Sequence, residues 1–228
     1  MTNYIMTHDL KKCMGCGACM IACKIENNVQ EGIKWLNYEA TTSGSFPHVR
    51  YEVQINQCNH CDNAPCARNC PTKAMHKAAG GLTLHDPKRC VGCRACMVAC
   101  PYNAITFNKD QPHALYNNDK AVVPGVTSTG KELTGRMRAP IPTYNPALEN
   151  GYVGIRKKGL VEKCTFCSHR LARGVQPRCV EACPASARLL GDLDDPRDPV
   201  HELLSKYASK VRMPERGTKP KVYYLRAY

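Results

Sequence analysis

The sequence predicts an α+β fold organised around bound metal rather than around aromatic side chains, and three observations support this. Its 228 residues, enough for one large domain or two small ones, include 16 cysteines that fall into four sets of four. Aromatic residues make up only 7% of the chain, with a single tryptophan. Sixteen Gly and 16 Pro break up the apolar stretches. This composition excludes a coiled coil, and no stretch approaches the roughly 18 to 20 apolar residues of a membrane span.

Each set places its cysteines within one short stretch of chain. Sets one and three share the spacing C-x2-C-x2-C-x3-C, set two has C-x2-C-x4-C-x3-C, and set four has C-x2-C-x11-C-x3-C. Proline follows the last cysteine of sets two, three and four, whereas Lys24 follows that of set one. In chain order the sets are Cys13, Cys16, Cys19 and Cys23; Cys58, Cys61, Cys66 and Cys70; Cys90, Cys93, Cys96 and Cys100; and Cys164, Cys167, Cys179 and Cys183.

The spacing of set three, with its proline, is that of the bacterial ferredoxins that bind 4Fe–4S clusters. Three thiolates on a tight loop hold one cluster. The fourth lies about one helical turn further on and completes a second cluster held by another set. Four sets of this kind predict four 4Fe–4S clusters with sixteen thiolate ligands.

Two other uses of cysteine fit the pattern poorly. A disulfide framework would force very small loops, because four cysteines lie within eleven residues in two places. Structural zinc usually pairs one C-x2-C with another roughly 15 to 20 residues away. Here three or four cysteines follow one another instead, so we interpret the sets as iron–sulfur ligands.

The chain also repeats itself. Residues 9–23 and 86–100 are identical at ten of fifteen positions, and the phrase C-x3-C-P-x2-A occurs at 66–74, 96–104 and 179–187. Repetition of this kind indicates an internally duplicated chain of ferredoxin-like units.

The separation of the sets predicts which of them share clusters. Only residues 71–89 separate sets two and three, as inside one two-cluster ferredoxin, and this segment predicts a short helix and then a hairpin turned at Gly80-Gly81. Sets one and four would then pair around it. The alternative pairs set one with two and set three with four. The nested pairing gives cluster one Cys13, Cys16, Cys19 and Cys183; cluster two Cys58, Cys61, Cys66 and Cys100; cluster three Cys90, Cys93, Cys96 and Cys70; and cluster four Cys164, Cys167, Cys179 and Cys23.

The predicted fold is therefore α+β, with two ferredoxin-like units of the bacterial two-cluster kind, a long irregular insertion and a C-terminal extension. The four parts are residues 1–57 plus 161–190, 58–107, the Pro- and Gly-rich 108–160, and 191–228.

Within these parts, we expect a strand at 49–55 and a helix at 198–210 whose apolar face holds Leu203, Leu204 and Tyr207. The tail 221–228 should be extended on the core or on a partner. Trp35 should pack in the core or at an interface, and the insertion should dock a partner or lie on the surface as a variable loop.

The order of the four sets resembles the iron–sulfur subunit of molybdopterin oxidoreductases of the dimethyl sulfoxide reductase family. Residues 163–170 (KCTFCSHR), 191–196 (GDLDDP) and 217–224 (GTKPKVYY) look like that family, and the nested pairing is its pattern. Residues 40–44 (ATTSG) and 58–62 (CNHCD) are similar to the small subunit of respiratory arsenate reductases; polysulfide, thiosulfate and catechol-dehydroxylating reductases have related subunits. The resemblance implies a large molybdopterin-guanine-dinucleotide catalytic partner, and a membrane anchor or a soluble redox carrier as the other partner. Lys24, which replaces the usual proline, should leave ligation intact.

Several charged side chains lie beside the cysteines. Basic residues precede the first cysteine of three sets, as Lys12, Arg89 and Lys163. Positive charge near a cluster favours its reduced form, although these side chains would also serve as ordinary surface charge. His60 and His169 lie next to ligands, but the sixteen cysteines already supply all the ligands that four clusters need. No iron therefore remains for a histidine to bind. We expect them to donate hydrogen bonds or to lie on the surface.

The remaining predictions concern function. Nucleotide-binding and catalytic motifs are absent, so we predict no catalytic residues and an electron-transfer subunit of an oxidoreductase of anaerobic respiration. A free-standing polyferredoxin carrier is the alternative. The formal charge of +13 first suggests nucleic acid, but four clusters of about −2 each would offset much of it, so we expect no nucleic-acid partner. Without a signal peptide or membrane span, the protein should be peripheral. It would lie in the periplasm by co-export with a signal-bearing partner, or in the cytoplasm.

Overall fold

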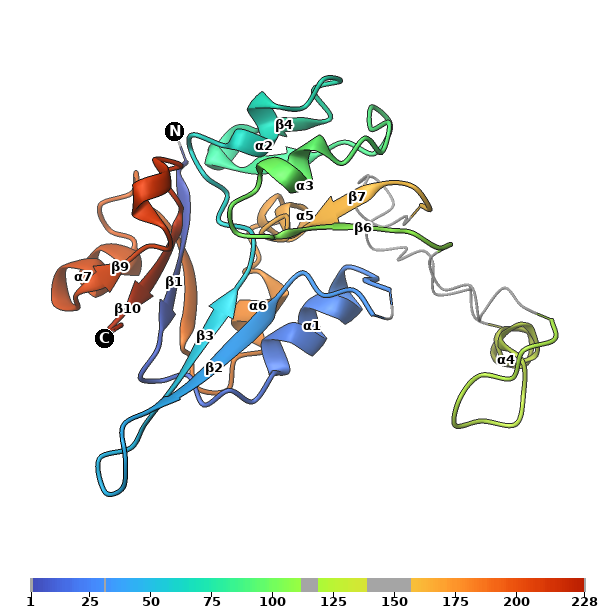
Figure 1. The fold of residues 1–228 in the computed structure, drawn as a ribbon, viewed down its shortest axis with the longest axis horizontal. Helices are drawn as coiled ribbons and strands as arrows, with labels where there is room; N and C mark the ends of the chain where they lie inside the picture. The colour runs from blue at the N-terminus through green and yellow to red at the C-terminus, as the bar shows by residue number, and fades with distance from the viewer. Residues whose placement is uncertain (1, 31, 112–118, 139–156, 228) are drawn as a thin grey trace.

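The computed structural model describes residues 2–30, 32–111, 119–138 and 157–227, and it is a mixed α/β structure with small sheets. Its main sheet has the order β8-β1-β10-β9, with β1 (Tyr4–Asp9) parallel to β10 (Val222–Leu225) and antiparallel to β8 (Arg188–Asp192). The short β9 (Ser209–Lys210) pairs antiparallel with β10. The first and last long strands of the chain, β1 and β10, thus lie side by side in one sheet (Figure 1). The extended conformation predicted for 221–228 is confirmed over Val222–Leu225, where three of the four residues are buried, and residue 228 lies outside the described residues.

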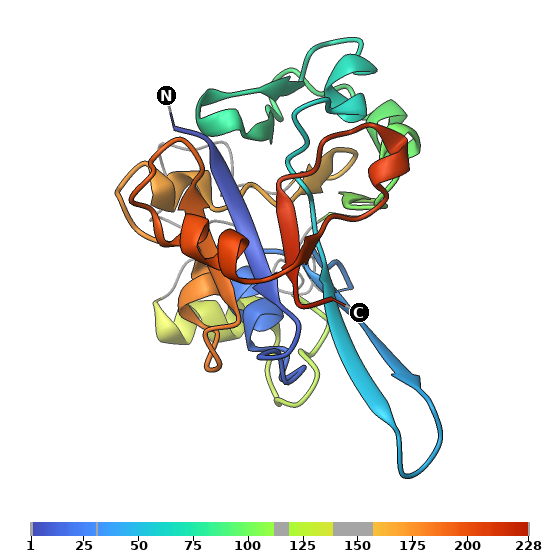
Figure 2. The same cartoon turned by 90° about the vertical axis from the view of Figure 1, so that its left-hand side faces the viewer.

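A hairpin extends from the body of the molecule (Figure 2). Its strands are β2 (Asn37–Ser43) and β3 (Arg50–Asn56), and β3 matches the strand predicted at 49–55. Every residue of β2 is exposed, whereas Val53 and Ile55 of β3 are buried. Trp35, just before β2, is also buried and packs in the first of two apolar cores.

Sets two and three surround a second, smaller core. Here α2 (Pro65–Arg68) packs on α3 (Ala95–Ala99), and β4 (Met75–Lys77) pairs with β5 (Thr83–His85) around the 3-10 turn Ala79–Gly81. The predicted hairpin at Gly80-Gly81 is confirmed, and both glycines have the left-handed φ that the turn needs. The α-helix lies before residues 71–89 rather than inside them. Proline at 71 disfavours helical conformation at Cys70 and ends the helix early.

The segment around set four joins both cores. Strand β7 (Val161–Lys163) pairs antiparallel with β6 (Ile105–Phe107), which follows set three. Two short helices follow, α5 (Ser168–Leu171) and α6 (Arg178–Glu181). Helix α6 packs on α1 (Ala18–Glu26), the helix of set one. The helices of sets one and four, and those of sets two and three, are therefore direct neighbours.

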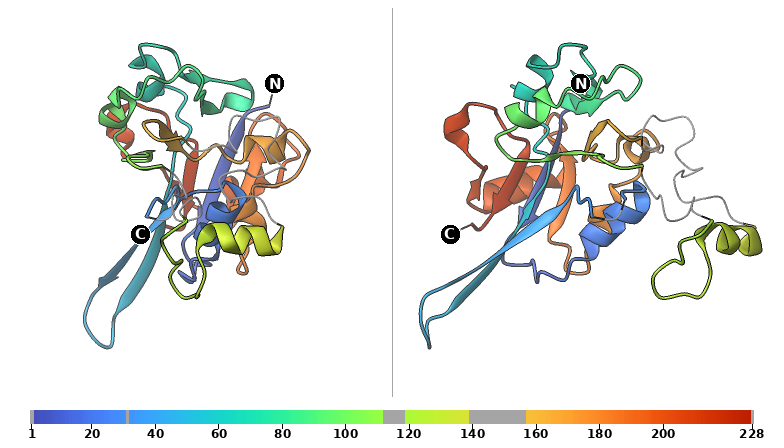
Figure 3. Two further views of the ribbon diagram at one scale, coloured as in Figure 1. Left: turned by 90° about the vertical axis from the view of Figure 1, so that its right-hand side faces the viewer. Right: turned by 45° about the vertical axis from the view of Figure 1, so that its right-hand side comes forward.

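Two further helices lie outside the cysteine sets. Within the insertion, α4 (Gly130–Met137) begins with a capping box between Thr129 and Glu132 and lies apart from the sheets (Figures 1 and 3). Helix α7 (Pro199–Lys206) is capped by Asp198 and confirms the predicted C-terminal helix, although it ends four residues before 210. A 3-10 turn at Pro214–Arg216 leads towards β10. The rest of the expected insertion, 112–118 and 139–156, lies outside the described residues.

Candidate metal centres

Two pockets bring together cysteines that are far apart in the sequence. Cys13, Cys16, Cys19 and Cys183 line one pocket of about 390 Å³, including the space open to solvent. Cys58, Cys61, Cys66 and Cys100 line a second pocket of about 330 Å³. Each pocket therefore holds three thiols from one set and the last thiol of another, the combination that the nested pairing predicts.

The other eight cysteines also fall into two neighbourhoods. Burial raises the pKa of Cys96 to about 11, and the neighbouring thiols Cys90, Cys70 and Cys93 add to the shift. Burial likewise raises the pKa of Cys23 well above its ordinary value, and the neighbouring thiols Cys164, Cys179 and Cys167 raise it further. In both neighbourhoods the last thiol of one set lies among three thiols of another.

The cysteine loops aim backbone N–H groups at sulfur. The amides of Gly92, Phe166 and Met75 each lie 3.4 Å from a cysteine Sγ, of Cys90, Cys164 and Cys70 respectively. The amide of Ala187 lies 3.3 Å from the Sγ of Cys183. Such donors stabilise a negatively charged thiolate, which is the form that binds metal.

The chemistry of these donors fits iron–sulfur clusters. All sixteen cysteines are free thiols, and burial raises the pKa of Cys66 and of Cys167 to about 12. Buried thiols of this kind ionise when a metal binds them. Within the described ranges, no three His, Cys, Asp or Glu side chains converge as one metal ion would require. A 4Fe–4S cluster, in which each iron binds one cysteine, is the group that the four thiols of such a pocket suit.

His60 connects sets two and four. Its fully buried ring stacks on Phe166 with 3.9 Å between ring centroids. The amide of Thr83 donates to Nδ1 at 3.2 Å, so that Nε2 donates to the carbonyl of Cys164 at 3.1 Å. Burial, and then the charge of Lys163, holds the pKa of His60 well below its ordinary value. His60 is thus a neutral hydrogen-bonding residue, as expected from the sequence.

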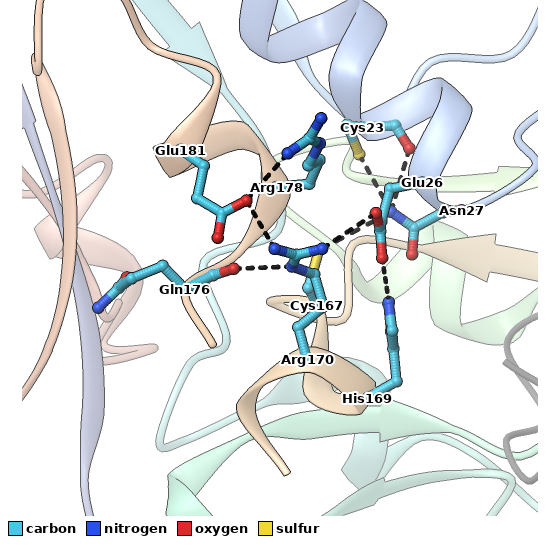
Figure 4. Close-up of polar contacts among 9 residues, drawn as sticks. All are labelled: Cys23, Glu26, Asn27, Cys167, His169, Arg170, Gln176, Arg178 and Glu181. Carbon is cyan, nitrogen blue, oxygen red and sulfur yellow. Dashed lines mark hydrogen bonds and ion pairs between the residues drawn. The ribbon is translucent and has the colours of Figure 1, made fainter. Parts of the chain in front are cut away.

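Beyond Cys23, the last turn of α1 reaches set four (Figure 4). The Nδ2 atom of Asn27 lies 3.0 Å from the carbonyl of Cys23, 3.7 Å from the Sγ of Cys23 and 3.9 Å from the Sγ of Cys167. Asn27 therefore contacts two thiols that the nested pairing assigns to one cluster. Its role was not predicted from the sequence. The one signal for it was the absence of proline after Cys23, which lets the helix continue.

An ion-pair network holds the same elements together. Glu26 accepts from His169 Nε2 at 2.8 Å and from Arg170 Nη1 at 3.3 Å. Arg170 continues to Glu181 at 2.6 Å, which Arg178 also contacts at 3.0 Å (Figure 4). Burial lowers the pKa of His169, and Glu26 opposes that shift. His169, like His60, hydrogen-bonds near the thiols.

The basic residues that precede the sets differ in their surroundings. Lys12 and Arg89 are exposed, whereas Lys163 is only 2% exposed. Arg188 is also buried, with 4% of the residue exposed, and lines the pocket of Cys13. Arg188 was not singled out from the sequence, because it lies five residues beyond the last cysteine of set four.

The fold and the thiol groups define a protein of the multi-cluster ferredoxin class, and the comparisons with known proteins agree. Residues 49–115 and 89–188 each match a 4Fe–4S dicluster domain. These two matches overlap at residues 89–115, which include set three.

Three curated relatives cover nearly the whole chain. The arsenate respiratory reductase iron-sulfur subunit ArrB of Shewanella sp. (strain ANA-3) is 48% identical over 98% of this chain and 96% of its own. A selenate reductase subunit of Mesobacillus selenatarsenatis is 35% identical, and a tetrathionate reductase subunit of Salmonella typhimurium is 34% identical. Both matches cover 98% of this chain and 72% of the relative.

The chain therefore belongs to the family of iron–sulfur subunits of dimethyl sulfoxide reductase-family enzymes. It is an electron-transfer subunit of a molybdopterin respiratory reductase. In the parts of the chain that the structure describes, no helix is long and apolar enough to cross a bilayer.

Proposed function

We propose that this subunit holds four 4Fe–4S clusters with the nested ligand pairing. The observation that carries the proposal is the pair of pockets, in which Cys183 joins set one and Cys100 joins set two. The packing of α1 on α6 and of α2 on α3 supports the same pairing, because it brings the corresponding sets together. It also supports the division into units of residues 1–57 plus 161–190 and 58–107, with the insertion and the C-terminal part attached.

The thiol groups form a continuous series. Cys19 of the first group neighbours Cys179 of the fourth, and Cys164 of the fourth neighbours Cys58 of the second. Cys96 and Cys100 then share one turn of chain between the second and third groups. Clusters held by these thiols would supply one-electron carriers at successive positions. The order one, four, two, three is the proposed path across the subunit.

The partners follow from the family. We propose that one end of this path faces a large molybdopterin catalytic subunit, and that the other faces a membrane anchor subunit or a soluble redox carrier. The insertion 108–160 is proposed as a docking arm. In its described part, Val126 is 44% exposed and Met137 is 73% exposed. Residence in the periplasm would then follow from co-export with a signal-bearing partner.

The relatives indicate which class of substrate the catalytic partner reduces. ArrB belongs to an arsenate reductase, and the other two relatives belong to selenate and tetrathionate reductases. We propose that the catalytic subunit reduces an oxyanion, with arsenate first because ArrB is 48% identical over almost the full length of both chains. Co-expression with the large catalytic subunit and assays with arsenate, selenate and tetrathionate test this. No turnover of any oxyanion by a molybdenum-loaded complex would overturn it.

Serine variants test the ligand pairing. Under the nested pairing, Cys183→Ser and Cys16→Ser alter the same EPR signal, because both residues hold cluster one. Under the sequential pairing, Cys183→Ser would instead alter the signal that Cys93→Ser alters. The unsubstituted protein should contain about 16 iron atoms, four for each of four clusters.

Co-purification tests the complex itself. We expect the chain to purify anaerobically with a large molybdenum-containing partner. A monomer with full iron content and no such partner, under conditions that preserve related complexes, would favour the free-standing carrier.

A further inference from the structure

Arg188 is a buried cation at the start of β8. Only 4% of the residue is exposed, and its Nη2 atom donates to the side-chain oxygen of Gln57. Its Nε and Nη1 atoms are buried without a hydrogen-bond partner among the described residues. The neighbouring ring of His8 is neutral, because burial, and then Arg188 itself, lowers the pKa of His8 to about 3. The guanidinium is therefore the positive charge of this pocket.

Arg188 lies between two thiol groups. It lines the pocket formed by Cys13, Cys16, Cys19 and Cys183. Strand β8, which begins at Arg188, also packs on α6, which carries Cys179 of the fourth group. One fixed charge thus faces both groups.

Lys163 occupies the corresponding position between the fourth and second groups. Its Nζ atom donates to the carbonyl of Thr83 and, at 3.0 Å, to the carbonyl of Cys164. Thr83 lines the pocket of Cys58, Cys61, Cys66 and Cys100, whereas Cys164 belongs to the fourth group. Lys163 therefore lies between the second and fourth groups.

Neither cation has a carboxylate partner in the ion pairs of the described residues. Moving an ion out of water is costly even after relaxation, so buried charges are almost always paired. Here the groups close enough to compensate are the thiols, which become thiolates when they bind iron. A cluster with four thiolates carries negative charge, and this charge increases on reduction.

We propose that Arg188 and Lys163 control the energetics of electron transfer. Each is a buried cation that raises the reduction potentials of the two clusters beside it. This inference rests on the proposed ligand pairing. Arg188 acts on clusters one and four, and Lys163 acts on clusters four and two. Cluster four, which lies between both cations, receives both effects, whereas cluster three receives neither.

Exposure explains why Lys12 and Arg89, which also precede cysteines, would not act in this way. Lys12 directly precedes Cys13 but is exposed, and solvent and salt screen exposed charges strongly. Lys12 is therefore a matched control for Arg188, since it lies beside the same cluster and carries the same charge.

The test is a redox titration of the four-cluster protein, with each midpoint potential followed by EPR. In Arg188→Gln, two of the four potentials should fall, and in Lys163→Gln two should fall. In the double variant three should fall, one of them by about the sum of the single shifts. Arg188→Lys should restore potentials close to those of the unsubstituted protein, and Lys12→Gln should leave all four nearly unchanged.

Several outcomes would overturn the inference. Unchanged potentials in a neutral variant with full iron content would do so, as would an equal shift of all four. If Arg188→Gln loses clusters one and four, Arg188→Lys tests whether the positive charge is what matters. Retention of both clusters in Arg188→Lys supports the role of the charge, and their loss rejects it. The serine variants Cys183→Ser and Cys16→Ser decide the ligand pairing independently, so failure of the inference and failure of the proposed function remain distinguishable.

Discussion

Sets one and three have the same cysteine spacing but form different structures. Both helices begin after a residue with left-handed φ, Gly17 before α1 and Arg94 before α3. However, α1 extends over nine residues and α3 over only five. The difference begins at the residue after the last cysteine, which is Lys24 in set one and Pro101 in set three. Proline disfavours helical conformation in the residue before it, and Cys100 is accordingly extended, with φ −82° and ψ 109°.

The extra turn of α1 changes what surrounds the thiols. It carries Glu26 to His169 and Arg170, and it carries Asn27 to the sulfurs of Cys23 and Cys167. Lys24 itself donates to the carbonyls of Gln30 and Ile33, at 2.7 and 2.6 Å. A departure from the family pattern that leaves the ligands in place thus creates a link between sets one and four.

The two loops also differ in how closely other chain segments approach them. Gly15 and Gly92 occupy the same position in the two sets, and both have φ near +70°. A Cβ on Gly15 would meet the side chain of Val53 at 3.0 Å. A Cβ on Gly92 would instead clash with the backbone carbonyl oxygen of Gly159. Identical motifs are therefore packed by different partners.

Removal of iron should have the largest effect, because it should unfold the regions of set one and set three alike. Cysteines form part of each apolar core, including Cys19 and Cys164 in the first and Cys66 and Cys96 in the second. Because metal binding is coupled to folding in sites of this kind, anaerobic chelation should yield a largely unfolded chain by near-ultraviolet circular dichroism. Persistent tertiary signals and cooperative unfolding after iron removal would contradict this.

Lys24→Pro should make set one resemble set three. Proline in a helix interior costs about 3 kcal/mol, so the last turn of α1 and its contacts should be lost while the cysteines still bind their clusters. Denaturation of the holoprotein should show reduced stability at unchanged iron content. Lys24→Ala is the control, because it removes the two hydrogen bonds of the ammonium but keeps the helix. Equal loss in both variants would show that the helical turn contributes nothing.

Alanine substitutions at Gly15 and Gly92 should destabilise the two loops to different extents. Both substitutions place a side chain at positive φ, which costs roughly 1–2 kcal/mol. Gly92→Ala should cost more than Gly15→Ala, because a backbone carbonyl gives way less readily than the end of a valine side chain. Thermal loss of the cluster absorbance measures the difference, and the reverse order would show that the approach of Gly159 to the set-three loop is not rigid.

Asn27→Leu should produce the smallest effect. It removes the hydrogen bond to the carbonyl of Cys23 and the weak contacts to two sulfurs, a loss of about 1 kcal/mol. Fewer donors near sulfur also lower the potential of a cluster. A single EPR signal, that of cluster four, should therefore shift to lower potential, with Asn69→Leu at the end of α2 as a control that contacts no sulfur in the described structure. A shift in a different cluster would contradict the assignment of Cys23 and Cys167 to one site.

Much of the local structure was predictable, because local rules govern it. The strand at 49–55, the hairpin at Gly80-Gly81 and the helix that begins after Asp198 follow from alternation, turn residues and capping, and all three are present. The misplaced helix before the hairpin and the overlong C-terminal helix are errors of boundary. Helix α4 contradicts the prediction of a wholly irregular insertion, and the capping box of Thr129 and Glu132 is the sequence signal for it.

The cysteine spacing alone predicts iron–sulfur chemistry, because it determines which sulfurs can converge on one loop. The spacing also shows that sets one and three share one motif. Tertiary packing then settles which thiols from distant sets meet, which charges are buried and what the last turn of α1 reaches. Lys12 and Lys163 precede cysteines in the same way, yet one is exposed and the other is buried between two thiol groups. Burial depends on chain segments that pack from elsewhere in the sequence, and burial decides whether a charge is screened by water or acts on its neighbours.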